Sequence, residues 1–317
     1  MKRMMKLSIL TVLVMIIFTS CIGSNRVENQ VKPYPATVRN TTIEQKPKAV
    51  ASLSPSITKM LIELGYQDAI VGYSSDSKIE GITEDKMIGT GLKPDFEKIG
   101  TLAPEVIFTN VPLTKVQMDK LSAVKIKVVV MPTVKSVYDL KTHYVDIITA
   151  MSGQVQANET GIAKVDVLQE KLDYIKSLVP AEKPTFLYVA SLDPIVATGD
   201  TFESSLLSYV GENLAASYTQ YNVKAEQLQK LNPDVIFFAS PLEAEHIKNS
   251  DLFKNSNAVK NNKLYVVDNA ELTLQNDQAS EVVRKIASQV YPDIDFTAKA
   301  ETVSSTPAKK KWYEVFK

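Results

Sequence analysis

The chain has 317 residues, which is enough for two domains of ordinary size with their own apolar cores. Its 36 basic and 36 acidic residues give a formal net charge of zero, so it has no overall basic field of the kind that attracts nucleic acid or anionic lipid. The composition therefore argues against a polyelectrolyte, nucleic acid included, as the partner.

The first residues predict export and a lipid anchor. Met1–Lys6 is basic and Leu7–Phe18 is an apolar run too short to span a bilayer, so residues 1–20 are expected to be a signal peptide. Cys21, the single cysteine, resembles the lipobox cysteine of bacterial lipoproteins, which becomes the acylated N-terminus of the mature protein. Phe18 departs from that pattern, and a cysteine beside an ordinary cleavage site is the alternative. We expect a membrane-anchored protein outside the cytoplasm.

Residues 21–46 are polar and interrupted by prolines, which predicts a flexible tether with structure beginning near Pro47. The N-terminal lobe is expected over residues 47–150, where β-rich and helical segments alternate as in a parallel α/β layer. Strands are predicted at 49–53, 69–73, 106–109 and 127–131, and helices at 57–64 and 117–124.

A long helix is predicted to join two lobes. Residues 151–180 contain no proline before Pro180, and apolar residues from Leu168 to Val179 recur at spacings of three or four. Thr160–Leu178 should therefore form an amphipathic helix, whose length would be about 28 Å at 1.5 Å per residue. Such a connection is a rigid rod, so we expect small lobe movements on ligand binding.

The C-terminal lobe, residues 181–296, follows the same plan as the first. Strands are predicted at 185–190, 235–239 and 264–268, and helices at 204–210 and 278–291. The tail, residues 297–317, is expected to be solvated, with a basic and aromatic segment that contacts lipid or a partner as the alternative.

One segment occurs twice, once in each half. Glu97–Phe108 returns as Glu226–Phe237, and both copies have a Glu seven positions before a Pro, an acidic residue after that Pro, and an apolar run. The separation of 129 residues between Pro104 and Pro233 is far longer than the ~20 to 50 residues of a solenoid repeat. The predicted fold class is therefore α/β, with two similar Rossmann-like lobes that contain parallel sheets and are joined by one long α-helix.

Three motifs in this order resemble the substrate-binding proteins of ABC importers for vitamin B12, haem and ferric siderophores. They are Ser52–Thr58 followed by Leu64-Gly65, Gly199–Phe202 followed by Val210–Leu214, and the repeated Leu-x-Pro-acid-Val-Ile-Phe segments. The resemblance covers residues 47–296. It implies a class III periplasmic-binding fold and a monomer that meets a permease dimer with its ATPase subunits.

The resemblance also assigns a role to two glutamates of the repeat. In that family a surface glutamate at the tip of each lobe docks into arginine pockets on the permease subunits, and Glu97 and Glu226 stand at the matching positions. Two separated carboxylates on a rigid body can meet a two-fold symmetric pair of cationic pockets and set the register of docking. The alternative is that each is an ordinary exposed helix residue.

A ligand is expected beyond the carboxyl ends of the parallel strands, where the loops of the two lobes face each other. Tyrosines there would suit a large planar or chelate ligand. Ser56 has helix N-capping as a second role, and Lys59 replaces a Glu found in many relatives. The predicted cleft residues are Ser54, Pro55, Ser56, Tyr73, Ser74, Asn110, Tyr188, Asp193, Phe202, Tyr218, Tyr221 and Ser240.

Metal and catalytic sites find little support. His143 and His246 lie far apart and no second cysteine exists, so neither a metal site nor an intrinsic cofactor is expected. Gly89-Thr90-Gly91 lacks the remaining glycine of a dinucleotide fingerprint, and no nucleophile elbow occurs, so the chain is not expected to be an enzyme.

The leading hypothesis is a solute-binding lipoprotein of an ABC importer that captures a metal chelate and delivers it to a membrane permease. A corrinoid such as cobalamin is favoured, with a ferric siderophore or haem next. The alternatives are an adhesion or sensory lipoprotein on the same fold and, less favoured, a metal-dependent hydrolase.

Overall fold

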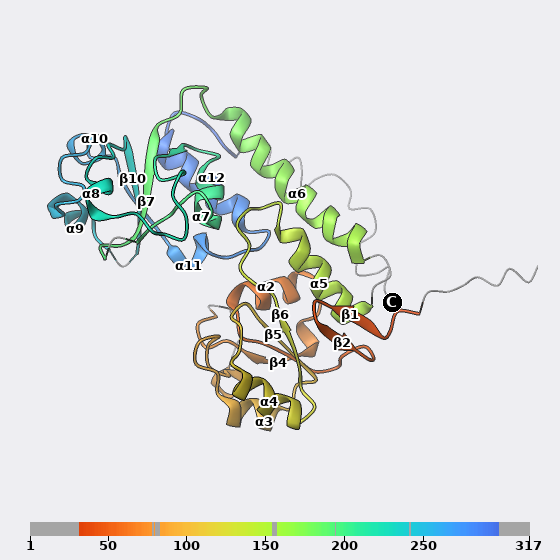
Figure 1. Ribbon diagram of the computed structural model, residues 1–317. Coiled ribbons are helices and arrows are strands. Elements are labelled where there is room, and N and C mark those ends of the chain that lie inside the picture. The colour runs from red at the N-terminus through yellow and green to blue at the C-terminus, as the bar shows by residue number, and fades with distance from the viewer. Residues whose placement is uncertain are drawn as a thin grey trace, which may run out of the picture. The chain divides into compact units, whose positions relative to one another are not determined.

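The computed structural model describes residues 32–77, 79, 83–153, 157–193, 195–240 and 242–297, and the following account concerns these residues (Figure 1). The predicted signal peptide, Cys21 and nearly all of the predicted tail lie outside them. Within these ranges no helix combines the length and the apolarity needed to cross a membrane.

The N-terminal lobe contains a parallel sheet with the strand order β4-β3-β5-β6. Alternate residues of each strand enter two apolar clusters, one on each face of the sheet. Helix α2 covers one face, and α3 and α4 cover the other, so the central strands are buried on both sides and are almost wholly apolar. The elements are β3 (Val50–Ser52), α2 (Pro55–Glu63), β4 (Ile70–Tyr73), α3 (Phe96–Leu102), β5 (Val106–Thr109), α4 (Lys115–Ala123) and β6 (Lys127–Val130), with short 3₁₀ turns at Gln67–Ala69 and Glu84–Lys86.

The C-terminal lobe repeats this plan. Its parallel strands have the order β9-β7-β10-β11, and a short strand, β8, pairs antiparallel to β7. Strands β3, β5 and β6 of the first lobe thus correspond to β7, β10 and β11 of the second, and the repeated sequence segments lead into β5 and β10. The elements are β7 (Thr185–Ser191), β8 (Ile195–Val196), α7 (Phe202–Leu207), β9 (Glu212–Asn213), α8 (Ala225–Leu228), β10 (Val235–Ala239), α9 (Ala244–Asn249), α10 (Asn257–Lys260), β11 (Leu264–Val267), α11 (Asn269–Leu272) and α12 (Ala279–Val290).

The predicted linking helix is confirmed as α6 (Ala157–Leu178), which packs against α5 (Leu140–Ser152) (Figure 1). Gly161 allows the two helices to approach closely, since a Cβ at this position would lie 2.5 Å from Val145 Cγ2. The fold class is therefore as predicted: two lobes with parallel sheets, joined by one long helix.

The predicted tether is wrong in its last part. Residues 36–46 were expected to be unstructured, but β1 (Ala36–Val38) and β2 (Thr41–Ile43) form an antiparallel hairpin. Ala36, Val38 and Ile43 are buried in it. Each strand has three residues, which is too short for an alternating pattern to stand out from a polar context.

Three contacts fix this hairpin and Tyr34, two residues before it, to the N-terminal lobe and α5. Arg39 Nε donates to Asp146 Oδ2 at 2.6 Å, and Tyr34 Oη donates to the carbonyl oxygen of Ala150 at 2.9 Å. Thr41 Oγ1 also donates to a carbonyl oxygen of β6 at 2.6 Å. The folded unit thus begins upstream of Pro47.

The acidic residue after the repeated proline has a structural role in both lobes. Asp234 Oδ2 accepts hydrogen bonds from the backbone N–H (3.1 Å) and Oγ1 (2.7 Å) of Thr185, the first residue of β7. Glu105 Oε1 accepts from the backbone N–H of Lys48, two residues before β3, at 3.3 Å. Each carboxylate therefore ties the entry of the repeat strand to the entry of its neighbour.

Candidate ligand-binding site

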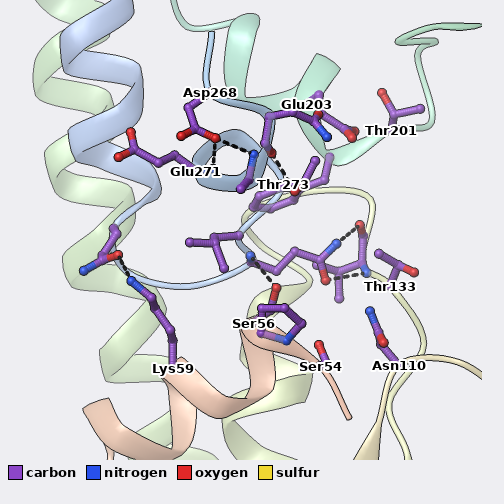
Figure 2. A pocket seen from close by; sticks show the side chains of 18 of the residues that line it. Ser54, Ser56, Lys59, Asn110, Thr133, Thr201, Glu203, Asp268, Glu271 and Thr273 are labelled. Carbon is purple, nitrogen blue, oxygen red and sulfur yellow. Dashed lines mark hydrogen bonds between the residues drawn. The ribbon is translucent and has the colours of Figure 1, made fainter. Parts of the chain in front are cut away.

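A cavity of about 1180 Å³ lies between the two lobes and is lined by residues of both. The lining loops follow the carboxyl ends of parallel strands, as expected for open α/β sheets. Ser54, Asn110 and Thr133 come after β3, β5 and β6, while Ser240 and Asp268 come after β10 and β11. Figure 2 shows Ser54 and Asn110 on one side of the cavity and Asp268 on the other.

The structure brings seven of the twelve predicted cleft residues to this cavity. They are Ser54, Pro55, Ser56, Asn110, Phe202, Tyr221 and Ser240. The other five, Tyr73, Ser74, Tyr188, Asp193 and Tyr218, are not among the described lining residues.

Two of these five lie directly behind the lining. Tyr188 is fully buried in β7, and its hydroxyl donates to Oδ1 of Asn269, a lining residue, at 2.6 Å. Ser74 is also buried, and its hydroxyl donates to the carboxylate of Asp76, another lining residue. Both therefore orient lining side chains.

The remaining three have other surroundings. Tyr73 and Tyr218 are half-buried and pack against the apolar clusters of their lobes. Asp193 is exposed in the turn after β7, where its backbone N–H donates to Ser191 Oγ at 3.1 Å. A residue's position near the end of a strand does not show whether its side chain points into the cavity, because the direction of a side chain in a loop has no sequence pattern.

The expected N-capping role of Ser56 is wrong, because α2 begins at Pro55 and its N-cap is Ser54. Ser54 does not cap the helix with its side chain, and its Oγ has no hydrogen-bond partner although the residue is only 1 % exposed. An unsatisfied buried hydroxyl is unfavourable by ~1 to 3 kcal/mol. Since Ser54 lines the cavity, a polar group of a ligand would satisfy it.

Gln275, which sequence reasoning missed, connects the lobes at the cavity. Its side-chain amide exchanges two hydrogen bonds with the backbone of Val134, from Val134 N–H to Oε1 and from Nε2 to the Val134 carbonyl oxygen, both at 3.3 Å. Its own backbone N–H donates to Ser56 Oγ at 3.3 Å. Gln275 is 4 % exposed, so these contacts are shielded from water.

Two lysines of the N-terminal lobe also reach across. Lys59 Nζ donates to Gln278 Oε1 at 2.9 Å, and Lys135 Nζ lies 3.2 Å from Asp200 Oδ2. All four residues line the cavity. Lys59 is thus part of the site, not merely solvated surface.

Tyr221 is held over the cavity by a strained turn. Gln220 and Tyr221 have φ values of 57° and 56°, in the left-handed region that is unfavourable for residues other than glycine. Their backbone N–H groups are anchored to Asp200 Oδ1 (2.8 Å) and Thr198 Oγ1 (3.1 Å). The Tyr221 hydroxyl donates to Glu203 at 3.1 Å, and burial raises the pKa of the Glu203 carboxyl.

A buried acid lies where the lobes meet behind the cavity. Glu63, at the end of α2, accepts a hydrogen bond from Tyr144 Oη of α5 at 2.7 Å. Burial raises the pKa of Glu63 to about 8, and the facing carboxyl of Asp277, just before α12, adds to the shift. Glu63 is therefore protonated in the folded protein at neutral pH.

Neither histidine reaches the cavity. His143 is buried in α5, where its Nε2 lies 2.8 Å from the carbonyl oxygen of Pro132, and burial lowers its pKa to about 4. His246 lies on α9, where Nδ1 accepts the Glu243 backbone N–H at 3.3 Å. Over the described part of the chain, no group of three or more His, Cys, Asp or Glu side chains could hold a metal ion.

Glu97 and Glu226 occupy equivalent places in the two lobes. Each is the second residue of its helix, α3 or α8, and each is exposed. Among the residues that the structure describes, no hydrogen bond or ion pair engages either carboxylate. Both side chains are thus free to meet another surface.

Comparison with known proteins decides the family. Residues 50–290 match the profile of the family described as Periplasmic binding protein. The chain belongs to this family. Its fold is that of the class III periplasmic binding proteins, and because the family consists of binding proteins, the chain is not an enzyme.

Two relatives from Bacillus subtilis strain 168 resemble most of the chain. YvrC, an ABC transporter substrate-binding lipoprotein, is 25 % identical over 284 residues, which cover 85 % of this chain and 90 % of YvrC. YfmC, a Fe(3+)-citrate-binding protein, is 24 % identical over 243 residues, which cover 72 % of this chain and 75 % of YfmC.

Among solved structures, the periplasmic haem-binding protein HutB of Vibrio cholerae superposes with a TM-score of 0.66 at 19 % sequence identity, covering 77 % of this chain and 99 % of HutB. At this identity the likeness concerns the fold alone.

Proposed function

We propose that this periplasmic binding protein captures a metal chelate between its lobes and delivers it to an ABC importer in the membrane. The observation that carries the proposal is the cavity of about 1180 Å³, lined by strand-end loops of both lobes. Pockets for drug-sized ligands measure roughly 300 to 1,000 Å³, so this one suits a larger molecule. The names of YvrC and YfmC, which refer to ABC transport and ferric citrate, support the same class.

Among chelates, a corrinoid is our first choice and a ferric siderophore the second. Haem in proteins is held by an axial His, Cys, Met or Tyr. The described lining residues include Tyr221 as their single side chain of these types, and its hydroxyl already donates to Glu203. A chelate that brings a fully coordinated metal needs no such ligand from the protein.

Delivery would use the two exposed glutamates and an anchor. Glu97 and Glu226 are free carboxylates at equivalent places on the lobes, which supports docking onto two cationic pockets of a permease dimer. Cys21 would carry the acyl chains that keep the protein at the membrane, as the description of YvrC as a lipoprotein supports.

The test is calorimetric titration with cyanocobalamin, haemin and ferric siderophores, together with an absorption spectrum of protein purified from its host. We expect a nanomolar-to-micromolar complex with cyanocobalamin, and a stabilisation of about 2.7 kcal/mol at a hundred times the Kd. Tighter binding of haemin or a ferric siderophore would correct the choice of ligand. If no chelate binds or raises the melting temperature, the transport proposal is wrong and an adhesion or sensory role takes its place.

A further inference from the structure

The two walls of the cavity differ in charge. The C-terminal lobe contributes four carboxylates, and its described lining residues include no lysine, arginine or histidine. We call this set the acidic wall: Asp200, Glu203, Asp268 and Glu271. The N-terminal lobe contributes Lys59, Lys135 and one further carboxylate, Asp76. Figure 2 shows Glu203, Asp268 and Glu271 on the side opposite Ser54, Ser56 and Asn110.

Ion pairs neutralise two carboxylates of the acidic wall, and the other two have no cationic partner among the described residues. Lys135 pairs with Asp200 at 3.2 Å, and Lys285, outside the lining, pairs with Glu271 at 3.2 Å. With Lys59 also counted, five carboxylates stand against three lysines, so two negative charges remain. Glu203 and Asp268 are the members of the acidic wall without a cationic partner among the described residues.

These two carboxylates are held in place. Glu203 is 8 % exposed and accepts the Tyr221 hydroxyl at 3.1 Å, so it lies in a poorly solvated part of the cavity. Asp268 caps α11, where Oδ1 accepts the backbone N–H groups of Ala270 (2.8 Å) and Glu271 (3.4 Å). Asp268 is exposed, whereas the buried Glu203 is poorly solvated and should interact more strongly with a ligand charge than a mobile carboxylate in water.

The opposite wall carries an independent sign of a ligand. Ser54 Oγ is unpartnered although Ser54 is 1 % exposed, and Figure 2 places it on the floor of the cavity beside Asn110. A buried hydroxyl in this position both donates and accepts, so it can meet a polar group at the rim of a chelate. The cavity is therefore built for a polar ligand and not for an apolar one.

We propose that the acidic wall selects the ligand by charge: the cavity takes neutral or positively charged metal chelates whose rim donates hydrogen bonds, and rejects net-anionic chelates of equal size. The inference rests on the function proposed above and names Glu203 and Asp268 as the specificity-determining residues. An amide or ammonium group on the chelate would donate to these carboxylates. A carboxylate on the chelate would meet like charge at both residues, and at the buried Glu203 water would screen this repulsion little.

The test uses two sets of chelates whose members share one metal complex and differ chiefly in net charge. One set is ferrioxamine B, which is a cation, its neutral N-acetyl derivative and its anionic N-succinyl derivative. The other is aquocobalamin, cyanocobalamin and cyanocobalamin with one side-chain amide hydrolysed to a carboxylate. By calorimetry at low ionic strength, we expect affinity to fall from cation to neutral to anion, with at least a tenfold gap between the ends of whichever set binds.

Substitutions then test whether Glu203 and Asp268 cause the difference in affinity between cationic and anionic chelates. Glu203→Gln keeps the size of the side chain, and Asp268→Asn keeps a good helix N-cap. Each should reduce the cation-to-anion affinity ratio about threefold or more, by tightening the anion and weakening the cation. Glu170→Gln is the matched control, since Glu170 is exposed on α6 outside the cavity lining and its loss should leave the ratio unchanged.

The outcomes separate this inference from the function on which it rests. Equal affinity across charges, tighter binding of the anion, or an unchanged ratio in both variants would overturn charge selection while chelate binding stood. Failure of every member of both sets to bind would overturn the two together.

Discussion

The two lobes have the same strand order but line the cavity with different side chains. Both have the same order of four parallel strands, and in both the repeated segment leads into the third strand of that order, β5 or β10. Yet the charged side chains that line the cavity from the N-terminal lobe are two lysines and one aspartate, whereas those from the C-terminal lobe are four carboxylates. The lesson is that strand order is set by apolar runs, while ligand chemistry is set by the loops after them.

The largest expected effect comes from removing the exposed glutamate that both lobes have at equivalent positions. Replacing both Glu97 and Glu226 with Ala should abolish uptake of the ligand, because two anchoring carboxylates would be lost, while the Kd for the ligand stays unchanged. Uptake of labelled ligand by cells and calorimetry on the purified variant measure the two quantities.

The single variants sharpen the comparison, since equal defects would show that the lobes dock equivalently. Glu182→Ala is a matched control, because Glu182 is exposed between α6 and β7 and makes no described contact. Normal uptake by the double variant would refute the docking assignment.

The next effect concerns the acid after the repeated proline. Asp234 accepts two hydrogen bonds from Thr185 and a third from Asn257 Nδ2 at 3.3 Å, whereas Glu105 accepts one at 3.3 Å. Asp234→Ala should therefore lower the free energy of unfolding by about 2 kcal/mol, and Glu105→Ala by less than ~1 kcal/mol. Urea denaturation of both variants measures the difference, and equal losses would show that the lobes use this residue alike.

A smaller loss of stability should follow when the bridge between the lobes is cut. Gln275→Ala removes both partners of the Val134 backbone N–H and carbonyl groups, which would cost about 1 to 2 kcal/mol. Gln278→Ala is the control, because Gln278 is exposed and bonds only the Lys59 side chain among lobe-bridging contacts, so its loss should cost less than ~0.5 kcal/mol. A loss in the control as large as that in Gln275→Ala would argue against the bridge.

The last prediction is a pH dependence of stability that arises from Glu63 at the lobe junction. The pKa of Glu63 is about 8 in the folded protein and near its ordinary value of 4.5 when unfolded, so the folded state binds the extra proton between these values. Stability from this group is complete below pH 4.5 and is lost as the pH rises through 8, with a slope below the one-proton limit of ~1.4 kcal/mol per pH unit.

The window from pH 6.5 to 8.5 isolates Glu63 from His143. The pKa of His143 is lowered to about 4, so its contribution runs the opposite way and is lost as the pH falls below 6.5. Urea midpoints of the wild type should fall across this window, and those of Glu63→Gln should stay level. A wild-type midpoint that rises with pH would exclude the assignment.

Most of the strands and helices could be predicted from the sequence, but fewer of the residues that line the cavity could. The limits of β5 and β10 were predicted to the residue, because each strand is an apolar run bounded by a proline and polar residues. The hairpin of β1 and β2 was not, because its strands are short and lie among polar residues. An apolar pattern identifies a strand only when the strand is long enough for the pattern to differ from the chance order of residues around it.

The site escaped prediction for a different reason. The acidic wall gathers Asp200 and Glu203, from the loop before α7 and its first turn, with Asp268 and Glu271, from the N-cap and third residue of α11, and no local spacing connects the two pairs. Asp268 follows β11 directly, so the expectation that the loops after parallel strands line the cleft could have found it. Gln275 had no such signal, because a glutamine that bonds a distant backbone looks in the sequence like any surface glutamine.

If Cys21 carries the predicted lipid anchor, the hairpin of β1 and β2 limits how far the folded unit can move from the membrane. If Cys21 is held at the membrane, a leash ending at Pro33 has 12 residues and spans at most about 40 Å when fully extended, against about 90 Å for one that ended at Pro47. A shorter leash confines the folded unit to a smaller volume above the lipid and raises its effective concentration near any permease within reach. By holding residues 36–43 on the lobe, β1 and β2 would shorten the connection to an anchored Cys21 and so limit the distance over which the protein can meet a permease.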